Sequence, residues 1–335
     1  MKKLLTLSMI SLTLQGLIAQ EESKLTISGS VDAYAQNYFS APADSGSSFG
    51  TAFAEQAGFA IGMGNIIASY EGEKTGVVLD LVTGPRGAGA TFNTDIVDGI
   101  VNQAYVYWNV TEKATLTFGR WNTFLGYEVI APAANFNYSC SYLFSNGPFS
   151  HVGLKADFAF SEDVSLMLAV TNPWDTNDVS TTGEYALGAQ LGLYGQYINV
   201  YSDRGLEGGL GFEVDYTGGF DLLDSFYLGI NAAYNDNDGS GFYGAALYPQ
   251  YSLSEAFAVG LRGEYFGLHG TAEEESDDPS VVAFTLTGSY VVDGNLIIKP
   301  ELRLDTWSNS MPYLDKDGMA ADKLSAVTLA AIYSF

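Results

Sequence analysis

Charged side chains recur at every second position in several segments of this 335-residue chain. In Ile298–Asp305 the sequence IKPELRLD places Lys, Glu, Arg and Asp on one face of an extended strand and apolar residues on the other. Rows of fixed charges set an electrostatic field that attracts or repels ions and polar solutes. The residues that we predict to line such a polar interior are Lys155, Asp157, Glu213, Asp215, Arg262, Glu264, Lys299, Glu301, Arg303 and Asp305.

Two architectures explain this alternation. In a soluble β-sandwich the apolar face would form the core and the charged face would meet solvent. In a membrane barrel the apolar face would meet lipid and the charged face would line the lumen. The alternation alone does not separate them. The N-terminal segment, the aromatic excess, the number of strands and the terminal Phe335 favour the barrel.

The N-terminal segment is typical of an exported protein. Lys2 and Lys3 precede an uncharged, largely apolar stretch, Leu4–Ala19, and polar residues follow it. We therefore expect a signal peptide over residues 1–19 and an outer-membrane barrel over 20–335. A single transmembrane helix is the alternative, but the 16 residues of this stretch fall short of the roughly 20 that a helical span needs.

Composition excludes one class of partner. The whole chain has a net charge of −25, and residues 20–335 carry 12 basic against 39 acidic residues, or −27. So acidic a chain, with no basic stripe, is not expected to bind nucleic acid. Cys140 is the only cysteine, so the fold cannot depend on an internal disulfide. The 22 Tyr and 20 Phe suit many strands with aromatic girdles.

Strand-like alternation recurs along the chain, and we count about 16 strands. Short turns alternate with mostly longer connections, and Pro85–Gly99 is one of the longer, glycine-rich loops. This rhythm predicts an all-β fold, a transmembrane antiparallel up-and-down β-barrel. The predicted short turns are Gly72–Lys74, Thr111–Lys113, Ser161–Asp163, Ser254–Ala256 and Asp293–Gly294.

One long segment, Gly126–Gly153, is too aromatic for a solvated linker. Long loops without regular structure are uncommon and usually functional. Aromatic residues would be exposed to water if this loop stood outside the barrel. We therefore predict that residues 125–150 form a long inward-folded constriction loop. The residues expected to act there are Glu128, Asn135, Phe136, Asn137, Tyr138 and Tyr142.

Catalytic and metal-binding signals are weak. His151 and His269 are the only histidines, and neither lies near a nucleophile motif, so we do not expect an enzyme. No Cys/His cluster is suited to zinc, and Asn235–Gly239 lacks the ligand spacing of a calcium loop. The acidic run Glu273–Asp278 is better explained as a solvated loop than as an ion site. No metal or cofactor is therefore expected.

Several segments resemble one known family. They are GRWNTFLGYE, the loop sequence GYEVIAPAANFNYSCSYLFSNGPFSHVG, LMLAVTNPWD, and the opening ISGSVDAY. With YEGEKTGVVLDL and QAYVYWNVTEKATLTFGR, they make the chain similar to the putative β-barrel porin-2 family of bacterial outer-membrane proteins. The resemblance implies an outer-membrane barrel acting as a porin. Family members often carry a basic residue where this chain has Cys140.

The expected function is passive diffusion of small hydrophilic solutes through a water-filled channel in the bacterial outer membrane. With Asp32 and Asp80 in the same phase, the predicted lumen holds four basic and eight acidic residues, which suggests a mild cation preference. A plugged barrel that serves as a surface anchor or adhesin is the alternative. Outer-membrane lipid and lipopolysaccharide are the expected partners, and a homo-oligomer is compatible with this fold.

Overall fold

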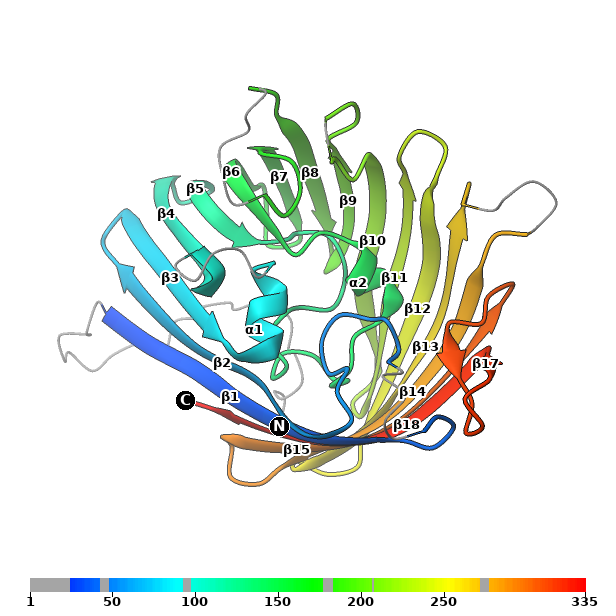
Figure 1. Cartoon of the computed structure of the whole chain (residues 1–335). Coiled ribbons are helices and arrows are strands. Elements are labelled where there is room, and N and C mark those ends of the chain that lie inside the picture. Colours follow the sequence, from blue (N-terminus) through cyan, green and yellow to red (C-terminus); the bar gives the residue numbers. More distant parts are fainter. Residues whose placement is uncertain (1–24, 43–47, 93–97, 177–182, 207, 272–276) are drawn as a thin grey trace.

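The computed structural model describes residues 25–335 except 43–47, 93–97, 177–182, 207 and 272–276, so the predicted signal peptide lies outside the described residues. Sixteen antiparallel strands form a closed barrel, as the sequence predicted (Figure 1). Each strand pairs with its neighbours in the chain, and β1 pairs with β18 to close the wall. The strands are β1 (Leu25–Tyr38), β2 (Gly58–Glu71), β3 (Thr75–Thr83), β4 (Val101–Thr111), β5 (Ala114–Asn122), β6 (Ser150–Ala159), β7 (Val164–Thr171), β8 (Ala186–Leu193), β9 (Gln196–Ser202), β10 (Phe212–Leu223), β11 (Phe226–Asp236), β12 (Gly241–Ser252), β13 (Phe257–His269), β14 (Ser280–Val291), β15 (Leu296–Ser308) and β18 (Lys323–Ser334).

The connections follow the predicted rhythm. Turns such as those between β2 and β3 or between β14 and β15 are only a few residues long, and both ends of the barrel sequence lie on that side. Most of the longer connections lie at the other end of the barrel. One of them, between β15 and β18, contains a small separate hairpin of β16 (Tyr313–Leu314) and β17 (Ala320–Ala321). In the described part of the chain, no helix is both long enough and apolar enough to cross a membrane.

The period of two divides each strand between the outside and the lumen. On β15, Leu302 and Leu304 are about half exposed, at 49% and 47%, whereas Arg303 is 4% exposed and Asp305 is fully buried. The apolar residues therefore lie on the outer surface, and the charged residues face inward. This is the arrangement of a barrel in lipid and the reverse of a soluble protein.

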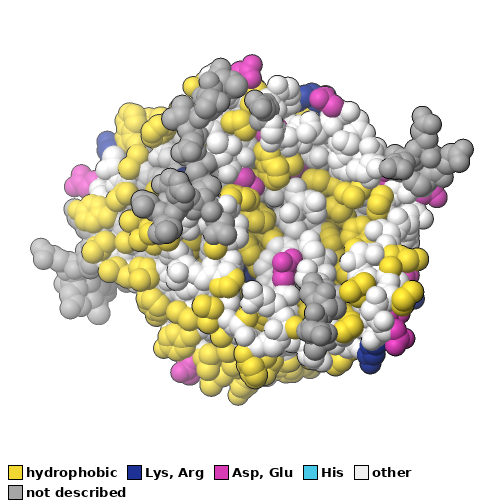
Figure 2. All heavy atoms as spheres, in the orientation of Figure 1, with side chains coloured by type: hydrophobic (Ala, Val, Ile, Leu, Met, Phe, Trp, Pro, Cys, Tyr) yellow, Lys and Arg dark blue, Asp and Glu magenta, His cyan; other side chains and the backbone are white. Residues whose placement is uncertain are grey.

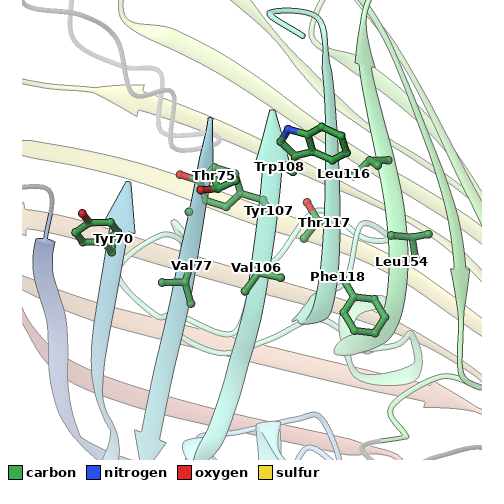
Figure 3. Close-up of a pocket in the computed structure, with 11 residues that line it drawn as sticks. Tyr70, Thr75, Val77, Val106, Tyr107, Trp108, Leu116, Thr117, Phe118 and Leu154 are labelled. Carbon is green, nitrogen blue, oxygen red and sulfur yellow. The ribbon is translucent and has the colours of Figure 1, made fainter. Parts of the chain in front are cut away.

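Many apolar side chains are exposed on the outer wall, and Figure 2 shows patches of them on one face of the molecule. Figure 3 shows part of this wall, a shallow groove of about 420 Å³ across the adjacent strands β2–β6. Val77, Val106, Trp108, Phe118 and Leu154 line it, and each is between 41% and 64% exposed. So large an apolar surface on a single chain fits contact with hydrocarbon.

The predicted loop Pro85–Gly99 is partly helical, which corrects that expectation. A seven-residue helix, α1 (Gly84–Ala90), has its proline in the first turn, and a 3₁₀ turn, η1, covers Asp98–Ile100. Its glycines concealed the helix, because glycine disfavours helical backbone. They are used for close packing instead. A Cβ on Gly87 would lie 3.1 Å from Val82, and one on Gly89 would lie 3.1 Å from Phe53.

A second short helix, α2 (Tyr142–Asn146), lies inside the barrel within the loop that joins β5 to β6 (Figure 1). Ser141 begins it, since its side chain accepts a hydrogen bond from the Phe144 N–H, and Gly147 follows it. The interior of the barrel is filled rather than hollow around α2. Buried residues of the loop, including Leu143 and Phe144, pack into apolar clusters with residues of the wall and of α1.

We expect Leu302→Arg to impair assembly into membranes, because an arginine on the lipid face near mid-bilayer costs roughly 2–4 kcal/mol. Refolding into lipid vesicles, followed by the mobility of unboiled samples on gels, measures the folded fraction. Leu302→Met is the matched control, since it keeps an apolar side chain of similar size. Equal folding of the two variants would contradict the assignment of this face to lipid.

Candidate functional site

The segment between β5 and β6, residues 123–149, is called the lumen loop below. Its two ends meet, because the Thr123 N–H donates to the Phe149 carbonyl at 2.9 Å. His151 Nε2 lies 2.9 Å from Thr123 Oγ1 at the same place. The loop then runs through the barrel and bonds to residues of β1, β10, β13 and β15. It is therefore folded into the lumen, as the sequence predicted.

Two wall carboxylates hold the loop by its backbone N–H groups. Glu301 on β15 accepts hydrogen bonds from the N–H groups of Tyr138 and Ser139 at 2.8 and 3.1 Å. Glu264 on β13 accepts from those of Tyr142 and Leu143 at 3.0 and 2.8 Å, in the first turn of α2. Hydrogen bonds to a charged acceptor are shorter and stronger than neutral ones.

Three wall cations hold the same stretch by its carbonyl groups. Arg262 donates to the Ser139 and Cys140 carbonyls at 2.6 and 3.1 Å, and Arg303 donates to the Cys140 carbonyl at 2.9 Å. Lys299 donates to the carbonyls of Pro132 and Asn135. These three side chains are at most 4% exposed. They therefore lie against the lumen loop.

Glu128 connects the loop to itself and to the wall. Its carboxylate is 2.6 Å from Arg262 Nη1 and accepts from both the N–H and the hydroxyl of Ser141. A second buried pair joins Arg303 to Asp305, which are 2.8 Å apart on β15. Removing one partner from such a buried pair would leave an isolated charge, which is strongly unfavourable.

The aromatic residues of the loop pack on the wall. The hydroxyl of Tyr138 donates to Asp32 on β1 at 2.5 Å. The hydroxyl of Tyr142 is 2.8 Å from Asp305. Phe136 covers Gly260, where a Cβ would lie 2.4 Å from the ring. Close contact of a ring with the wall therefore requires glycine at that position.

The two amides predicted to line a constriction have different roles. Asn137 donates from Nδ2 to Thr287 Oγ1 on β14 at 2.7 Å, and thus also ties the loop to the wall. Asn135 bonds within the loop, accepting from the Val129 N–H and donating to its carbonyl. Both side chains are less than a tenth exposed.

The four remaining predicted residues lie on β6 and β10, apart from the ions that bond to the backbone of Pro132–Leu143. Lys155 and Asp157 on β6 pair with each other at 2.8 Å, and their side chains are 23% and 40% exposed. Asp215 on β10 accepts hydrogen bonds from the Gly126 N–H of the loop and from Asn199 and Asn231. Glu213, also on β10, is 2% exposed.

Arg86 in α1 also bonds to the lumen loop, and it was not predicted from the sequence. Its guanidinium donates to the carbonyls of Ile130 and Tyr138 and lies 4.8 Å from the ring centre of Phe53. Its isolation as a basic residue in the glycine-rich stretch was the available signal. Desolvation opposes the charged form of Arg86, but its interactions with the ionisable groups of Cys140, Tyr138 and Asp32 outweigh this effect and raise its pKa.

Cys140 is fully buried at the centre of the cluster, beside Phe144 and Phe149. Burial raises the pKa of its thiol to about 12, so the thiol is neutral and unreactive in the docked loop. The basic residue that the family resemblance leads one to expect at this position is absent. Arginines from other segments bond to the backbone around it instead, and two of them share its carbonyl.

Arg120 follows Gly119, which has a φ of +134°, a backbone conformation that favours glycine. The pairing of β5 with β4 and β6 continues through this point without a shift. The guanidinium is 6% exposed and donates to the Ala90 carbonyl at the end of α1. This contact was not foreseen from the alternation of β5.

A family model described as putative beta-barrel porin-2, OmpL-like, matches residues 24–335. The chain belongs to this family. The match covers nearly the whole barrel and agrees with the resemblance found in the sequence. Family and fold together place this porin-family barrel in the bacterial outer membrane. Among curated proteins, no match was found.

Solved outer-membrane proteins share the fold. The outer membrane channel DcaP of Acinetobacter baumannii is 15% identical, with a TM-score of 0.61 over 96% of this chain and 100% of that one. An anion-selective porin from Comamonas acidovorans is 9% identical, with a TM-score of 0.60 over 93% and 99%. OmpT of Vibrio cholerae, also 9% identical, has a TM-score of 0.55 over 94% and 99%. At these identities the likeness establishes the architecture alone.

We expect Glu301→Gln to loosen the lumen loop without unfolding the barrel. The amide would place an N–H donor against a backbone N–H, and a hydrogen bond to a charged group, worth about 1.5–3 kcal/mol, would be lost. Limited proteolysis within residues 123–149 should become at least several-fold faster. Glu112→Gln, at the exposed β4–β5 turn, is the control. Equal cleavage of both variants would show that Glu301 does not hold the loop.

Proposed function

We propose that this barrel is a diffusion channel for small hydrophilic solutes with a mild preference for cations. The observation that carries the preference is a surplus of carboxylates without a basic partner. In the described part of the lumen, Asp32, Asp80, Asp215, Glu264 and Glu301 accept hydrogen bonds only from uncharged donors.

Fewer basic groups are left without a carboxylate. Arg262, Arg303 and Lys155 each form an ion pair, whereas Arg86 and Lys299 donate only to backbone carbonyls in the bonds described above. The resulting field is negative and extends beyond the hydrogen-bonded groups themselves. It favours the entry of cations over anions.

Selectivity cannot be transferred from proteins with the same architecture. The neighbour from Comamonas acidovorans is described as anion-selective, although its barrel is similar. Lumen side chains set the sign of selectivity, so the selectivity of this chain is inferred from its own charges.

One structure of the Vibrio cholerae protein is described as a trimer form. By analogy we propose that this barrel also forms a homo-oligomer, which cross-linking in membranes would test. The apolar wall is proposed to contact membrane lipid and lipopolysaccharide.

A plugged barrel that serves as a surface anchor is the second candidate, and the dense packing around the lumen loop favours it. Tyr138, Cys140 and Ser141 are essentially inaccessible to solvent, and α1 packs against the same region.

An enzyme is the least favoured function. His151 bonds to Thr123, and His269 bonds to the Asn235 carbonyl, so the contacts of both histidines are structural.

Conductance in a planar bilayer with a KCl gradient tests the channel directly. The intact protein should conduct, with a reversal potential of the sign that cation flow requires. Deleting residues 133–147 should raise conductance several-fold and weaken selectivity, because the wall keeps its own hydrogen bonds when the loop is removed.

Two outcomes would contradict this proposal in different ways. A reversal potential of the opposite sign would refute the cation preference but leave the channel. An intact protein that never conducts, combined with a deletion variant that does, would establish the plugged barrel instead.

A further inference from the structure

Glu213 stands apart from the other lumen carboxylates. Its side chain is 2% exposed, and its Oε2 atom has no hydrogen-bond partner in the described structure. None of the described ion pairs includes it. Its Oε1 atom lies 3.8 Å from where a Cβ would stand on Gly147, the residue after α2. The carboxyl group is therefore closed in by the end of the lumen loop.

The groups around Glu213 offer no compensating charge. In the sheet it pairs with Tyr201 on β9 and Asn235 on β11, neither of which is basic. Asp215 on its own strand and Asp203 after β9 are the charged groups that act on it, and both are acidic. The hydroxyl of Tyr201 is already donated to Asp203 at 3.0 Å.

Asp203 and Asp215 differ from Glu213 in being well supplied with donors. Asp203 also accepts from the Gly211 N–H at 2.7 Å, and Asp215 accepts from Asn199, Asn231 and Gly126. An ionised carboxylate buried without donors or a cation is strongly unfavourable. The neutral acid also leaves Oε2 without a hydrogen bond, but it avoids the much larger cost of a buried charge, so the surroundings of Glu213 favour the protonated form.

We propose that Glu213 is a proton-operated latch, neutral while the lumen loop is docked, whose ionisation releases the loop end at Gly147 from β10. Only release lets water reach the ionised carboxylate of Glu213, and that water also weakens its repulsion by Asp203 and Asp215. The docked state binds the proton more tightly than the released state, so raising the pH shifts the population toward release. The effect of this release on conductance rests on the proposed function.

The latch would act on one end of the loop. The stretch from Pro132 to Leu143 remains held by Arg262, Glu264, Lys299, Glu301 and Arg303, none of which depends on Glu213. The C-terminal end of α2 has no comparable ionic anchor among the described contacts. Release is therefore expected to move the segment around Asn146 and Gly147 while the barrel stays intact.

Single-channel conductance between about pH 5 and pH 9 is the first test. The intact protein should conduct several-fold better at the alkaline end. Glu213→Gln, which has the same shape and stays neutral, should remain at the low level throughout. Glu112→Gln should behave as the intact protein does. A pH step that persists in Glu213→Gln, or a conducting intact protein without a step, would overturn the proposal.

A second measurement does not require conduction. Asn146→Cys in a Cys140→Ser background can be reacted with a water-soluble maleimide, with and without Glu213→Gln. The labelling rate with Glu213 is divided by the rate with Glu213→Gln. Because both proteins carry the same thiol, this ratio removes the pH dependence of the thiol itself. The ratio should be near one at low pH and rise with pH, whereas a flat ratio refutes the latch even in a conducting channel. A rising ratio in a protein that never conducts would refute the channel and retain the latch.

Discussion

Hydrogen bonds between charged wall residues and the backbone of the lumen loop are the interaction on which the interior depends. A loop of irregular backbone has N–H and carbonyl groups that cannot pair with one another, and buried ions need partners too. Glu264 and Glu301 take up N–H groups, while Arg262, Lys299 and Arg303 take up carbonyls. Each set satisfies the other, so the loop can cross the barrel without regular structure beyond the short helix α2.

This arrangement also changes the meaning of the alternating charges. A charged row on a strand indicates which face points into the lumen, but it does not distinguish a side chain in a water-filled passage from one that anchors a loop. Lys155 and Asp157 remain partly exposed, whereas Arg262 and Glu264 are buried against the loop. The difference arises from where the loop lies, and that depends on contacts between β13 or β15 and residues more than a hundred positions away.

The barrel was accessible from the sequence because each of its signals is local. Period-two alternation marks a strand, and turns such as Asp293–Gly294 mark its end. The inward course of the loop could be predicted too, because its aromatic residues require burial. The helix α1 could not, since Gly84, Gly87 and Gly89 disfavour a helix. Gly84 has a φ of +87°, and all three glycines allow close packing. Arg86 lies in that helix, so its contacts with the lumen loop could not be predicted either.

The lumen loop is anchored more strongly to β13 and β15 than to β10, and its end near β10 is therefore the part expected to move. On β13 and β15 the loop is bound through ions whose separation would expose several buried charges at once, so that side is expected to open last. On β10 Asp215 accepts a hydrogen bond from the loop, whereas Glu213 lies beside the loop end and its Oε2 atom has no hydrogen-bond partner in the described structure. A loop that is held by several ions on one side, and whose end only meets the proposed latch residue Glu213 on the other, is expected to open at β10 first. If the barrel is the channel that we propose, release of the loop end opens a passage for solutes along β10, next to an ionised Glu213.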